Sequence, residues 1–492
     1  MASQSSPPAA HALAGKLQRG PGDVDPKTPD ARVCGNENAA AFADAPAFVR
    51  GLAFDRLPDD VVACAKRNLL DLIGIAAGGS ATRAAVIANA YAATQLCGTD
   101  RSARILFDGR RAGLAGAAFA GATTIDALDG HDGHALTKGH AGAALLPALL
   151  ALLDGAGESE PAASVDGREF LAALVLGYEI ATRAGMALHA TVPDYHCSGA
   201  WNALGCAAVA ARLLGFDAAR TRHALGIAEY FGPRGQILRA CDSPTMVKDG
   251  SGWGAHAGVT AALLARDGFT GAPALTVERE DAASFWTDLG TRWRIREQYL
   301  KPYPVCRWAQ PAVEAALALQ RAQGFAASDI ATVAIESFRE AVALGSQCAM
   351  PRTTEEAQYS LSFPVAAALV FGRVGAAEVD ATGLADARVA RLVAATIAVE
   401  DVELSRRFPA ERWARVRIAL ADGRQFASQP AQARGGPEDP LPDGELKEKY
   451  RSLADPVLGA ARSARIEQAV RALAEDGGAL ASLREEILRP AV

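Results

Sequence analysis

Seventeen consecutive residues, from Asp126 to Gly142, hold three of the chain's eight histidines and three aspartates. The stretch reads DALDGHDGHALTKGHAG. Histidine and aspartate can ligate a metal ion, and a histidine with an unperturbed pKa near ~6.5 can exchange protons with a substrate near neutral pH. The same residue types also suit a polar turn between helices. Because these interpretations lead to different functions, the stretch is the first candidate for a reactive centre.

Other regions also carry reactive side chains that packing does not obviously require. PDYHCSGAW places His196 directly before an apolar segment, and SPTMVKDGSGWG places Lys248 among glycines near an expected helix start. LKPYPVCRWAQ contributes Lys301 and Arg307, and EEAQYSLSF contributes Tyr359. Lysine and arginine side chains can bind carboxylates and stabilise negative charge that develops during a reaction.

The residues alone leave several alternatives open. Aspartate and histidine ligate zinc, manganese or iron, but the spacing matches no HExxH, facial-triad or CxxC pattern. His196 is equally compatible with a helix cap, Lys248 with a surface lysine and Tyr359 with a core aromatic. Convincing GxGxxG, GxxxxGKS/T and GxSxG motifs are absent, which argues against nucleotide-dependent and serine-hydrolase chemistry.

Most of the elements that must position these residues are predicted to be helices. LPDDVVACAKRNLLDLIGIAAGG begins with a proline and two acids, has apolar residues at helical spacing, and ends in two glycines. GREFLAALVLGYEIATRAG, SGAWNALGCAAVAARLLGF and WGAHAGVTAALLARDGF follow the same pattern. Their many small residues allow close helix packing, so we expect a tightly packed helical bundle.

The pattern changes after about residue 272. TRWRIREQYL and IATVAIESF are predicted strands with the helix PAVEAALALQRAQG between them, and ARVRIALADGRQFASQP is a predicted hairpin with Asp-Gly in its turn. The fold class is therefore mainly α with an α+β part. We expect a disordered tail over 1–36, a helical domain over 37–271, an inserted α+β lid domain over 272–436, and a return to the helical domain over 437–492.

Composition excludes several classes of function. A chain of 492 residues is expected to form two domains, and 50% hydrophobic with 22% charged residues is typical of soluble globular proteins. The net charge of -6 gives no basic surface for nucleic acid or anionic membrane. No run of 18 apolar residues predicts a membrane span, and the eight scattered cysteines are typical of reduced cytosolic thiols. We therefore expect a cytoplasmic protein.

Taken together and in order, several of these stretches resemble the MmgE/PrpD family of 2-methylcitrate dehydratases, cis-aconitate decarboxylases and iminodisuccinate epimerases. The resemblance is carried by LLDLIGIAAGG, DALDGHDGHALTKGHAG, YHCSGAWNALGCAAVAARLLG, TMVKDGSGWGAHAG, LKPYPVCRWAQPAVEAA, EEAQYSLSFPVAAAL and ELKEKYRSLAD. It implies a helical domain interrupted by an α+β lid, a homodimer, no cofactor and no metal. The active-site positions that it implies are Asp129, His140, His196, Lys248, Lys301 and Tyr359, with His134 as a weaker candidate.

The resemblance also implies roles for these residues. His140 and His196 would be the acid–base pair on opposite faces of a small polycarboxylate. Lys248, Lys301 and Arg307 would bind carboxylates and stabilise an enediolate-like intermediate. Asp129 would orient a histidine or a substrate hydroxyl, His134 would help to bind substrate, and Tyr359 would close over the ligand or donate to the leaving group.

The chain departs from the family pattern at four positions. His131 stands in place of the first member of an Asp-Asp pair, and Gly252 stands where many members have a histidine. Trp308 and Gln310 stand where histidines usually follow the Cys-Arg of the lid motif. These changes predict a substrate that differs from 2-methylcitrate.

The predicted function is a cofactor-independent lyase of 2-methylcitrate dehydratase type, which moves a proton next to a carboxylate with loss of water or CO2. An epimerase of an imino- or substituted dicarboxylate is the first alternative, and a metal-dependent hydrolase is the second. A non-catalytic interaction protein would leave the histidine, lysine and tyrosine set without a purpose. The sequence does not choose among dehydration, decarboxylation and epimerisation, because all three begin with similar proton chemistry.

Overall fold

The computed structural model describes residues 42, 44–98, 101–344 and 350–491. The tail predicted over residues 1–36 lies outside these ranges. From residue 40 onward, the chain forms a single unit of contacts. The predicted boundaries between the helical and α+β domains therefore stay predictions, although the elements on either side of them are clear.

The first half of the chain is helical, as its apolar periodicity predicts. Helix α2 (Asp59–Gly79) follows Pro58, and its first turn carries Asp59 and Asp60, where negative charge favours a helix N-terminus. The helices of this half are α1 (Ala45–Gly51), α2, α3 (Arg83–Gln95), α4 (Leu114–Asp126), α5 (Gly142–Asp154), α6 (Gly167–Thr191), α7 (Gly199–Leu213), α8 (Ala218–Phe231), α9 (Leu238–Asp242), α10 (Ser251–Arg266) and α11 (Leu275–Glu278). A short antiparallel pair, β1 (Ser102–Arg104) and β2 (Arg111–Gly113), lies between α3 and α4.

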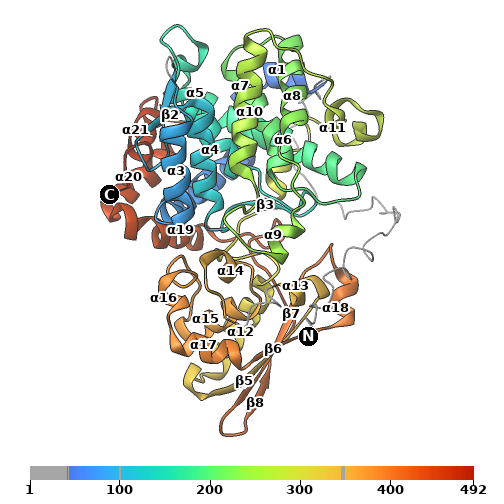
Figure 1. Cartoon of the computed structure of the whole chain (residues 1–492), viewed down its shortest axis with the longest axis vertical. Helices are drawn as coiled ribbons and strands as arrows, with labels where there is room; N and C mark the ends of the chain where they lie inside the picture. The colour runs from blue at the N-terminus through green and yellow to red at the C-terminus, as the bar shows by residue number, and fades with distance from the viewer. Residues whose placement is uncertain (1–41, 43, 99–100, 345–349, 492) are drawn as a thin grey trace, which may run out of the picture. The chain divides into compact units, whose positions relative to one another are not determined.

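Helices α4, α5, α7 and α10 pack against one another and form the centre of the helical part (Figure 1). Their buried faces are rich in alanine, glycine and leucine, so that the helices approach closely. The loops at the ends of α4 and before α5, α7 and α10 therefore meet at one place. These are the loops that hold the reactive residues.

The second part is built on a sheet of the order β6-β5-β7-β8, with β9 also pairing with β7. Strands β5 and β6 are parallel, and the other pairs are antiparallel. The strands are β5 (Ile330–Ser337), β6 (Thr396–Glu400), β7 (Trp413–Leu420), β8 (Gln425–Ala427) and β9 (Ala431–Gln432). The predicted strand IATVAIESF is β5, and the predicted hairpin is β7–β8 with Gly423 at a φ of 92° in its turn.

Helices pack with this sheet and then return the chain to the helical part. They are α12 (Gln310–Gln323), α13 (Arg339–Ala343), α14 (Thr354–Gln358), α15 (Ser362–Phe371), α16 (Ala381–Leu384), α17 (Ala387–Ala394) and α18 (Val402–Arg407), followed by α19 (Asp443–Leu458), α20 (Ala460–Ala472) and α21 (Ala479–Ile487). Helix α19 packs on α2, near the other end of the sequence (Figure 1). The predicted fold class, a discontinuous helical domain with an α+β insertion, is confirmed.

One predicted element is wrong. TRWRIREQYL forms a 3-10 turn over Arg294–Glu297 and only a two-residue strand, β4 (Gln298–Tyr299), which pairs with β3 (Gly133–His134). The Glu297 carboxylate accepts hydrogen bonds from Arg292 and Arg294 at 2.8 and 3.0 Å, which favours a local turn. The Ile295 N–H donates to Glu179 on α6 at 3.0 Å. Contacts to α6 override the alternating pattern.

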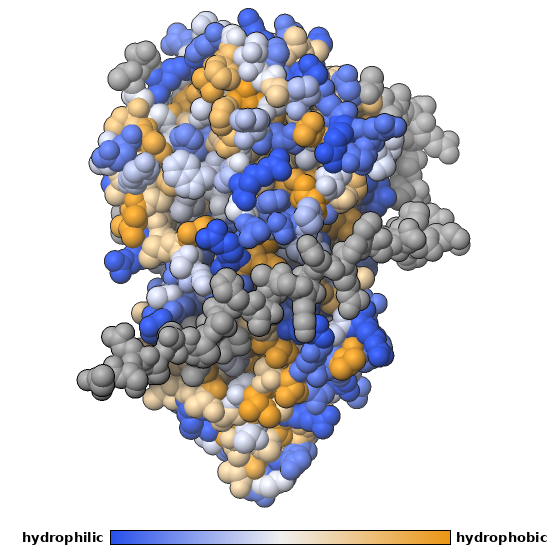
Figure 2. Space-filling view, turned by 45° about the vertical axis from the view of Figure 1, so that its right-hand side comes forward, coloured by the Kyte–Doolittle hydropathy of each residue, from blue (hydrophilic) through white to orange (hydrophobic). Residues whose placement is uncertain are grey.

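Helix α6 is long and apolar enough to cross a membrane by length and composition, and the bent pair α2 and α3 passes the same test together. The most apolar 18-residue window of α6 is completely buried inside the protein. A helix that is apolar on all sides is typical of a core as well as of a membrane span. On the face drawn in Figure 2, apolar and polar side chains are interspersed. Burial in the core therefore accounts for the composition of α6.

Candidate active site

The aspartates and histidines at the end of α4 and in the loop before α5 are buried rather than solvated. The three aspartates and three histidines from Asp126 to His140 are each at most 7% exposed. A solvent-facing turn is therefore the wrong interpretation of this stretch. Buried ionisable groups need partners, and those partners come from α7, from the start of α10 and from the α+β part.

His140 has one ring nitrogen that is free to act as a base. Its Nδ1 is hydrogen-bonded to the backbone carbonyl of Asp132, and its Nε2 lies 3.3 Å from Asp249 Oδ2 and 4.0 Å from Asp129 Oδ1. Because a carbonyl only accepts hydrogen bonds, Nδ1 carries the proton in the neutral ring. The unprotonated nitrogen, Nε2, therefore faces the two carboxylates.

The surroundings of His140 favour its neutral form. Burial lowers the pKa of the imidazole to about 4, and the neighbouring His131 ring and Lys301 ammonium group act in the same direction. The carboxylates of Asp249 and Asp129 oppose this shift but do not cancel it. At neutral pH, His140 is therefore an unprotonated base.

Asp249 and Ser198 also surround His140, and neither residue was predicted from the sequence. The Ser198 hydroxyl donates to Asp249 Oδ2 at 2.8 Å and accepts the His140 backbone N–H at 2.8 Å. Burial raises the pKa of Asp249. The only available signal was position, since Asp249 directly follows Lys248 and Ser198 lies two residues after His196.

A second histidine–aspartate pair lies beside the first. His131 Nε2 is 3.1 Å from Asp126 Oδ1, and the His131 and His140 rings have centroids 4.1 Å apart. Ser251, the first residue of α10, donates to Asp126 from its backbone N–H at 2.9 Å and from its hydroxyl at 3.0 Å. Burial lowers the pKa of His131 well below its usual value. His131, one of the departures from the family pattern, is therefore part of the buried cluster.

Lys301 from the α+β part pairs with Asp129 in the loop. Its Nζ donates to the Asp129 carbonyl and to Asp129 Oδ1, both at 2.9 Å. Burial opposes ionisation of Asp129, but Lys301 and Lys248 outweigh it and hold the Asp129 pKa at about 2. Asp129 Oδ2 is buried without a hydrogen-bond partner among the residues that the structure describes. That oxygen is available to a substrate group.

Lys248 and Tyr359 lie together on another side of the cluster. Lys248 Nζ donates to Gln358 Oε1 and lies 4.9 Å from the centroid of the Tyr359 ring. Gln358 Nε2 in turn donates to the Ala127 carbonyl at 3.1 Å. Burial lowers the pKa of Lys248 and raises that of Tyr359. The end of α14 thus brings Gln358 and Tyr359 to the loop of the helical part.

Two residues of the cluster have strained backbones. Asp129 and Lys248 have φ angles of 49° and 48°, in the left-handed region that residues other than glycine rarely adopt. Such strain persists only where surrounding contacts hold it in place, and it is concentrated at functional sites. Both residues had been assigned active-site roles from the family resemblance.

Among the residues that the structure describes, the His196 side chain makes no hydrogen bond or ion pair with the cluster. It is half-buried, its Nδ1 donates to the Arg234 carbonyl at 3.3 Å, and its backbone N–H donates to His189 Nε2 at 3.1 Å. Within the described ranges, no hydrogen bond, ion pair or ring contact joins the His196 side chain to His140. The pairing of these two histidines as acid and base therefore stays a prediction.

Arg307 and His134 have structural partners. Arg307 donates to the carbonyls of Ala433 and Arg434 at 2.9 and 2.6 Å, and thus binds the segment after β9. His134 Nε2 lies 3.0 Å from Glu297 Oε2 and ties the loop to the turn before β4. Their predicted roles in substrate binding stay predictions.

Local contacts account for three of the four departures from the family pattern. A Cβ atom at position 252 would clash with the Thr123 hydroxyl and the Phe119 carbonyl, so this site has no room for a histidine. Gln310 donates to the carbonyls of Tyr303 and Val305 at 3.1 and 3.0 Å and shapes the loop after Lys301. The Trp308 ring lies edge-on to the rings of Phe338 and Phe408, so an aromatic contact accounts for this residue.

The cluster is a poor setting for a metal ion. Over the described residues, no group of three histidine, cysteine, aspartate or glutamate side chains could hold one. The positive charges of Lys301 and Lys248 also act on Asp129 and would repel a cation there. A carboxylated, anionic ligand suits this charge arrangement better. Independence from metals stays a prediction.

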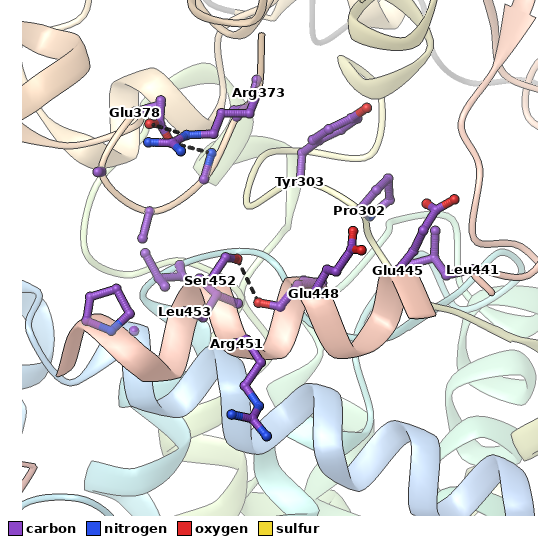
Figure 3. A pocket seen from close by; sticks show the side chains of 18 of the residues that line it. Pro302, Tyr303, Arg373, Glu378, Leu441, Glu445, Glu448, Arg451, Ser452 and Leu453 are labelled. Carbon is purple, nitrogen blue, oxygen red and sulfur yellow. Dashed lines mark hydrogen bonds and ion pairs between the residues drawn. The ribbon is translucent and has the colours of Figure 1, made fainter. Parts of the chain in front are cut away.

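A cleft of about 1590 Å³ lies behind the loop. Leu128, Pro302 and Lys449 line it, so it borders the backbone of the loop without including the cluster itself. Figure 3 shows α19 along one wall of the cleft, with Glu448 and Ser452 toward the cleft and Arg451 pointing away. We therefore treat the cleft as separate from the reactive centre.

Comparison with known proteins gives two family matches that cover most of the chain. The MmgE/PrpD N-terminal domain matches residues 44–291, and the MmgE/PrpD C-terminal domain matches residues 303–475. Cis-aconitate decarboxylase-like protein oryM of Aspergillus oryzae is 26% identical over 449 residues, which cover 85% of this chain and 91% of the relative. Cis-aconitate decarboxylase of Aspergillus terreus is 24% identical over 477 residues, which cover 89% of this chain and 94% of the relative. The chain therefore belongs to the MmgE/PrpD family.

Proposed function

We propose that this protein is a cofactor-independent lyase that moves a proton at a carbon next to a carboxylate in a small polycarboxylate, with loss of CO2 or water. Membership of the family and the similarity to cis-aconitate decarboxylases support a lyase-type enzyme. The observation that carries the proposal is the buried, neutral His140, whose unprotonated Nε2 lies 3.3 Å from Asp249 and 4.0 Å from Asp129, the carboxylate that Lys301 binds.

In the proposed mechanism, His140 Nε2 exchanges a proton with the substrate carbon. Lys301 and Lys248 bind the substrate carboxylates and stabilise the negative charge that spreads from that carbon. The low pKa of His140 keeps the ring ready to accept a proton, and its fixed Nδ1–H points away from the reacting carbon. Tyr359, whose hydroxyl stays protonated because its pKa is raised, is the proposed donor to a leaving group.

For decarboxylation, the bond between carbon and the departing carboxylate breaks and leaves its electron pair on that carbon. CO2 is released, and the new C–H bond forms with a proton that solvent supplies through His140 Nε2, since this nitrogen carries no proton in the neutral ring. For dehydration, His140 removes the proton and the hydroxyl leaves with a proton from Tyr359. Cis-aconitate is the first substrate to test, because the Aspergillus terreus relative is a cis-aconitate decarboxylase.

The test is to incubate the purified protein with cis-aconitate, 2-methylcitrate and citrate in deuterated buffer and to follow the products by NMR. We expect a new product that has lost CO2 or water. Deuterium at the reacting carbon is expected after decarboxylation, because solvent supplies that hydrogen, whereas dehydration removes a hydrogen from that carbon and adds none. Deuterium uptake by the compound with no loss of CO2 or water would favour the epimerase alternative. Activity that is lost on chelation, together with stoichiometric metal in elemental analysis, would favour the metal-dependent hydrolase alternative.

The homodimer is proposed to form through an apolar surface of the helical part. Val86, Ile87 and Tyr91 on α3 and Trp253 and Leu264 on α10 are large apolar residues that are exposed in the single chain. An exposed apolar group of this kind often marks a protein–protein interface. Light scattering should give the mass of two chains, and W253E should shift it toward one. A monomeric wild-type protein at micromolar concentration would overturn this proposal.

A cytoplasmic location is part of the same proposal. The described cysteines Cys64, Cys97, Cys197, Cys206, Cys241 and Cys306 are free thiols. Free thiols are typical of a reducing compartment. Microscopy of the tagged protein, or fractionation of its natural host, would test this location directly.

A further inference from the structure

The late motif ELKEKYRSLAD resembles the family pattern, but nothing above gives it a role in the reaction. It lies within α19, from Glu445 to Asp455. Lys449 within it reaches two buried partners: its Nζ donates to Asp71 Oδ1 on α2 at 2.6 Å and to the Gly130 carbonyl at 2.7 Å. The Lys449 side chain is 9% exposed and that of Asp71 is 1% exposed. This is a buried contact between α2, α19 and the loop of the reactive centre.

Gly130 is the residue that follows the strained Asp129. Lys301 binds the Asp129 carbonyl and Lys449 binds the Gly130 carbonyl, so two lysines hold two consecutive peptide groups. A Cβ atom on residue 130 would clash with the end of the Ile75 side chain on α2, so the loop backbone packs against that side chain. The strained conformation therefore has a hydrogen bond on each carbonyl and a helix behind it.

Global stability is a weak explanation for this contact. Removing a lysine and an aspartate from water is costly, and a well-packed apolar pair of similar volume is often as stable or more stable. Burial accordingly lowers the pKa of Lys449 and raises that of Asp71. An apolar residue in place of Lys449 would, however, leave the Gly130 carbonyl without this donor. The group that requires Lys449 is therefore the Gly130 carbonyl in the loop.

We propose that Lys449 is a positioning residue, which fixes the Asp129–Gly130 backbone so that the Asp129 carboxylate stays between Lys301 and His140. This inference rests on the proposed function only in that Asp129 serves that reaction. Asp71 then holds the Lys449 ammonium group in place and balances its charge.

The test separates positioning from charge balance by comparing K449M with the double variant K449M/D71N. K449M removes the donor to Gly130 and also leaves the Asp71 carboxylate buried without its partner, so both thermal stability and turnover should fall. In K449M/D71N the unpaired charge is gone and the melting temperature should recover, but the donor to Gly130 is still missing. Turnover should stay about 10- to 100-fold below wild type, with KM within about 2-fold, because a misplacement of about 1 Å costs up to about 100-fold.

Lys447 provides the matched control on the same helix. It is half exposed and pairs with Glu467 at 3.6 Å, away from the loop. K447M should keep wild-type turnover and stability. If K449M/D71N regains turnover together with its melting temperature, Lys449 only balances the charge of Asp71 and the proposal is overturned.

Hydrogen–deuterium exchange gives a readout that does not depend on the reaction. We expect amides in residues 127–134 to exchange faster in K449M/D71N than in wild type or K447M, because the loop has lost a restraint. Unchanged exchange in this segment would overturn the proposal even if no substrate is ever found. A wild-type protein that turns over none of the carboxylates, with faster exchange in the double variant, would contradict the proposed function alone.

Discussion

At the scale of single residues, the environment of each ionisable group in the cluster fixes a different protonation state. Asp129 is held ionised by lysines, His140 is held neutral by burial, and Tyr359 is held protonated by burial. A base, an acid and a fixed negative charge thus coexist within one buried volume at neutral pH. Such divergent pKa values are typical of active sites that catalyse proton transfer.

The low pKa of His140 predicts the acid limb of the pH–activity profile. An unperturbed histidine base would lose activity as the pH falls through about 6.5. Because the pKa of His140 is lowered to about 4, its ring stays unprotonated further down, and kcat/KM should fall only near pH 4 to 5. The measurement is kcat/KM between pH 4 and 8, with melting temperatures as a control for unfolding. If kcat/KM of the fully folded protein fell by half already near pH 6.5, this prediction would be contradicted.

His196 gives a second prediction at this scale. If it is the second acid–base group, as the family resemblance implies, H196A should lower kcat by about 100-fold or more. Steady-state kinetics of the purified variant, with H223A as the control for loss of a half-buried histidine elsewhere, would measure this. Full turnover in H196A would remove His196 from the acid–base pair and leave His140 as the base.

At the scale of elements, the reactive loop is placed by helix packing. Helix α4 ends at Asp126 and α10 begins at Ser251, and the hydrogen bonds between these two residues fix the ends of both helices. Lys248 and Asp249 come immediately before α10 and therefore lie beside the loop. Close packing between α4 and α10 thus sets the distance from Lys248 to Asp129.

Gly252 tests this packing. G252A would push a Cβ atom into the Thr123 hydroxyl and the Phe119 carbonyl on α4 and should destabilise the fold by about 1–3 kcal/mol. G444A on α19 is the matched control, because a Cβ atom there meets nothing within 4 Å. Chemical denaturation of both variants gives the free energies. A G252A variant as stable as G444A would show that α4 and α10 do not pack so closely.

At the scale of the whole molecule, the sequence predicted the architecture well because the signals were local. Helices α2, α6 and α12 and the β7–β8 hairpin follow from periodicity and from their end signals. The segment before β4 was wrongly predicted as a strand, because its turn depends on Glu179, which lies more than one hundred residues away. Patterns within a segment carry no information about such partners.

The candidate site was predicted less completely, for the same reason. Asp129, His140, Lys248, Lys301 and Tyr359 meet in the structure. Their residue types marked them as reactive, but only the family resemblance assigned them to one active site. Asp126, Asp249, Ser198 and Gln358 act through contacts between distant segments, which spacing within one sequence does not reveal. His196 and Arg307 were assigned by their motifs, while their contacts in the structure lie elsewhere.

The central claim is that His140 Nε2 exchanges the proton of a carboxylated substrate. The most direct measurement is the rate of deuterium incorporation from solvent, with cis-aconitate as substrate, for the wild-type protein and H140N. The asparagine can keep the hydrogen bond to the Asp132 carbonyl while it removes Nε2. We predict a loss of about 100- to 10,000-fold in H140N, because this is the usual contribution of a general base. A folded H140N that incorporates deuterium at the wild-type rate would contradict the account.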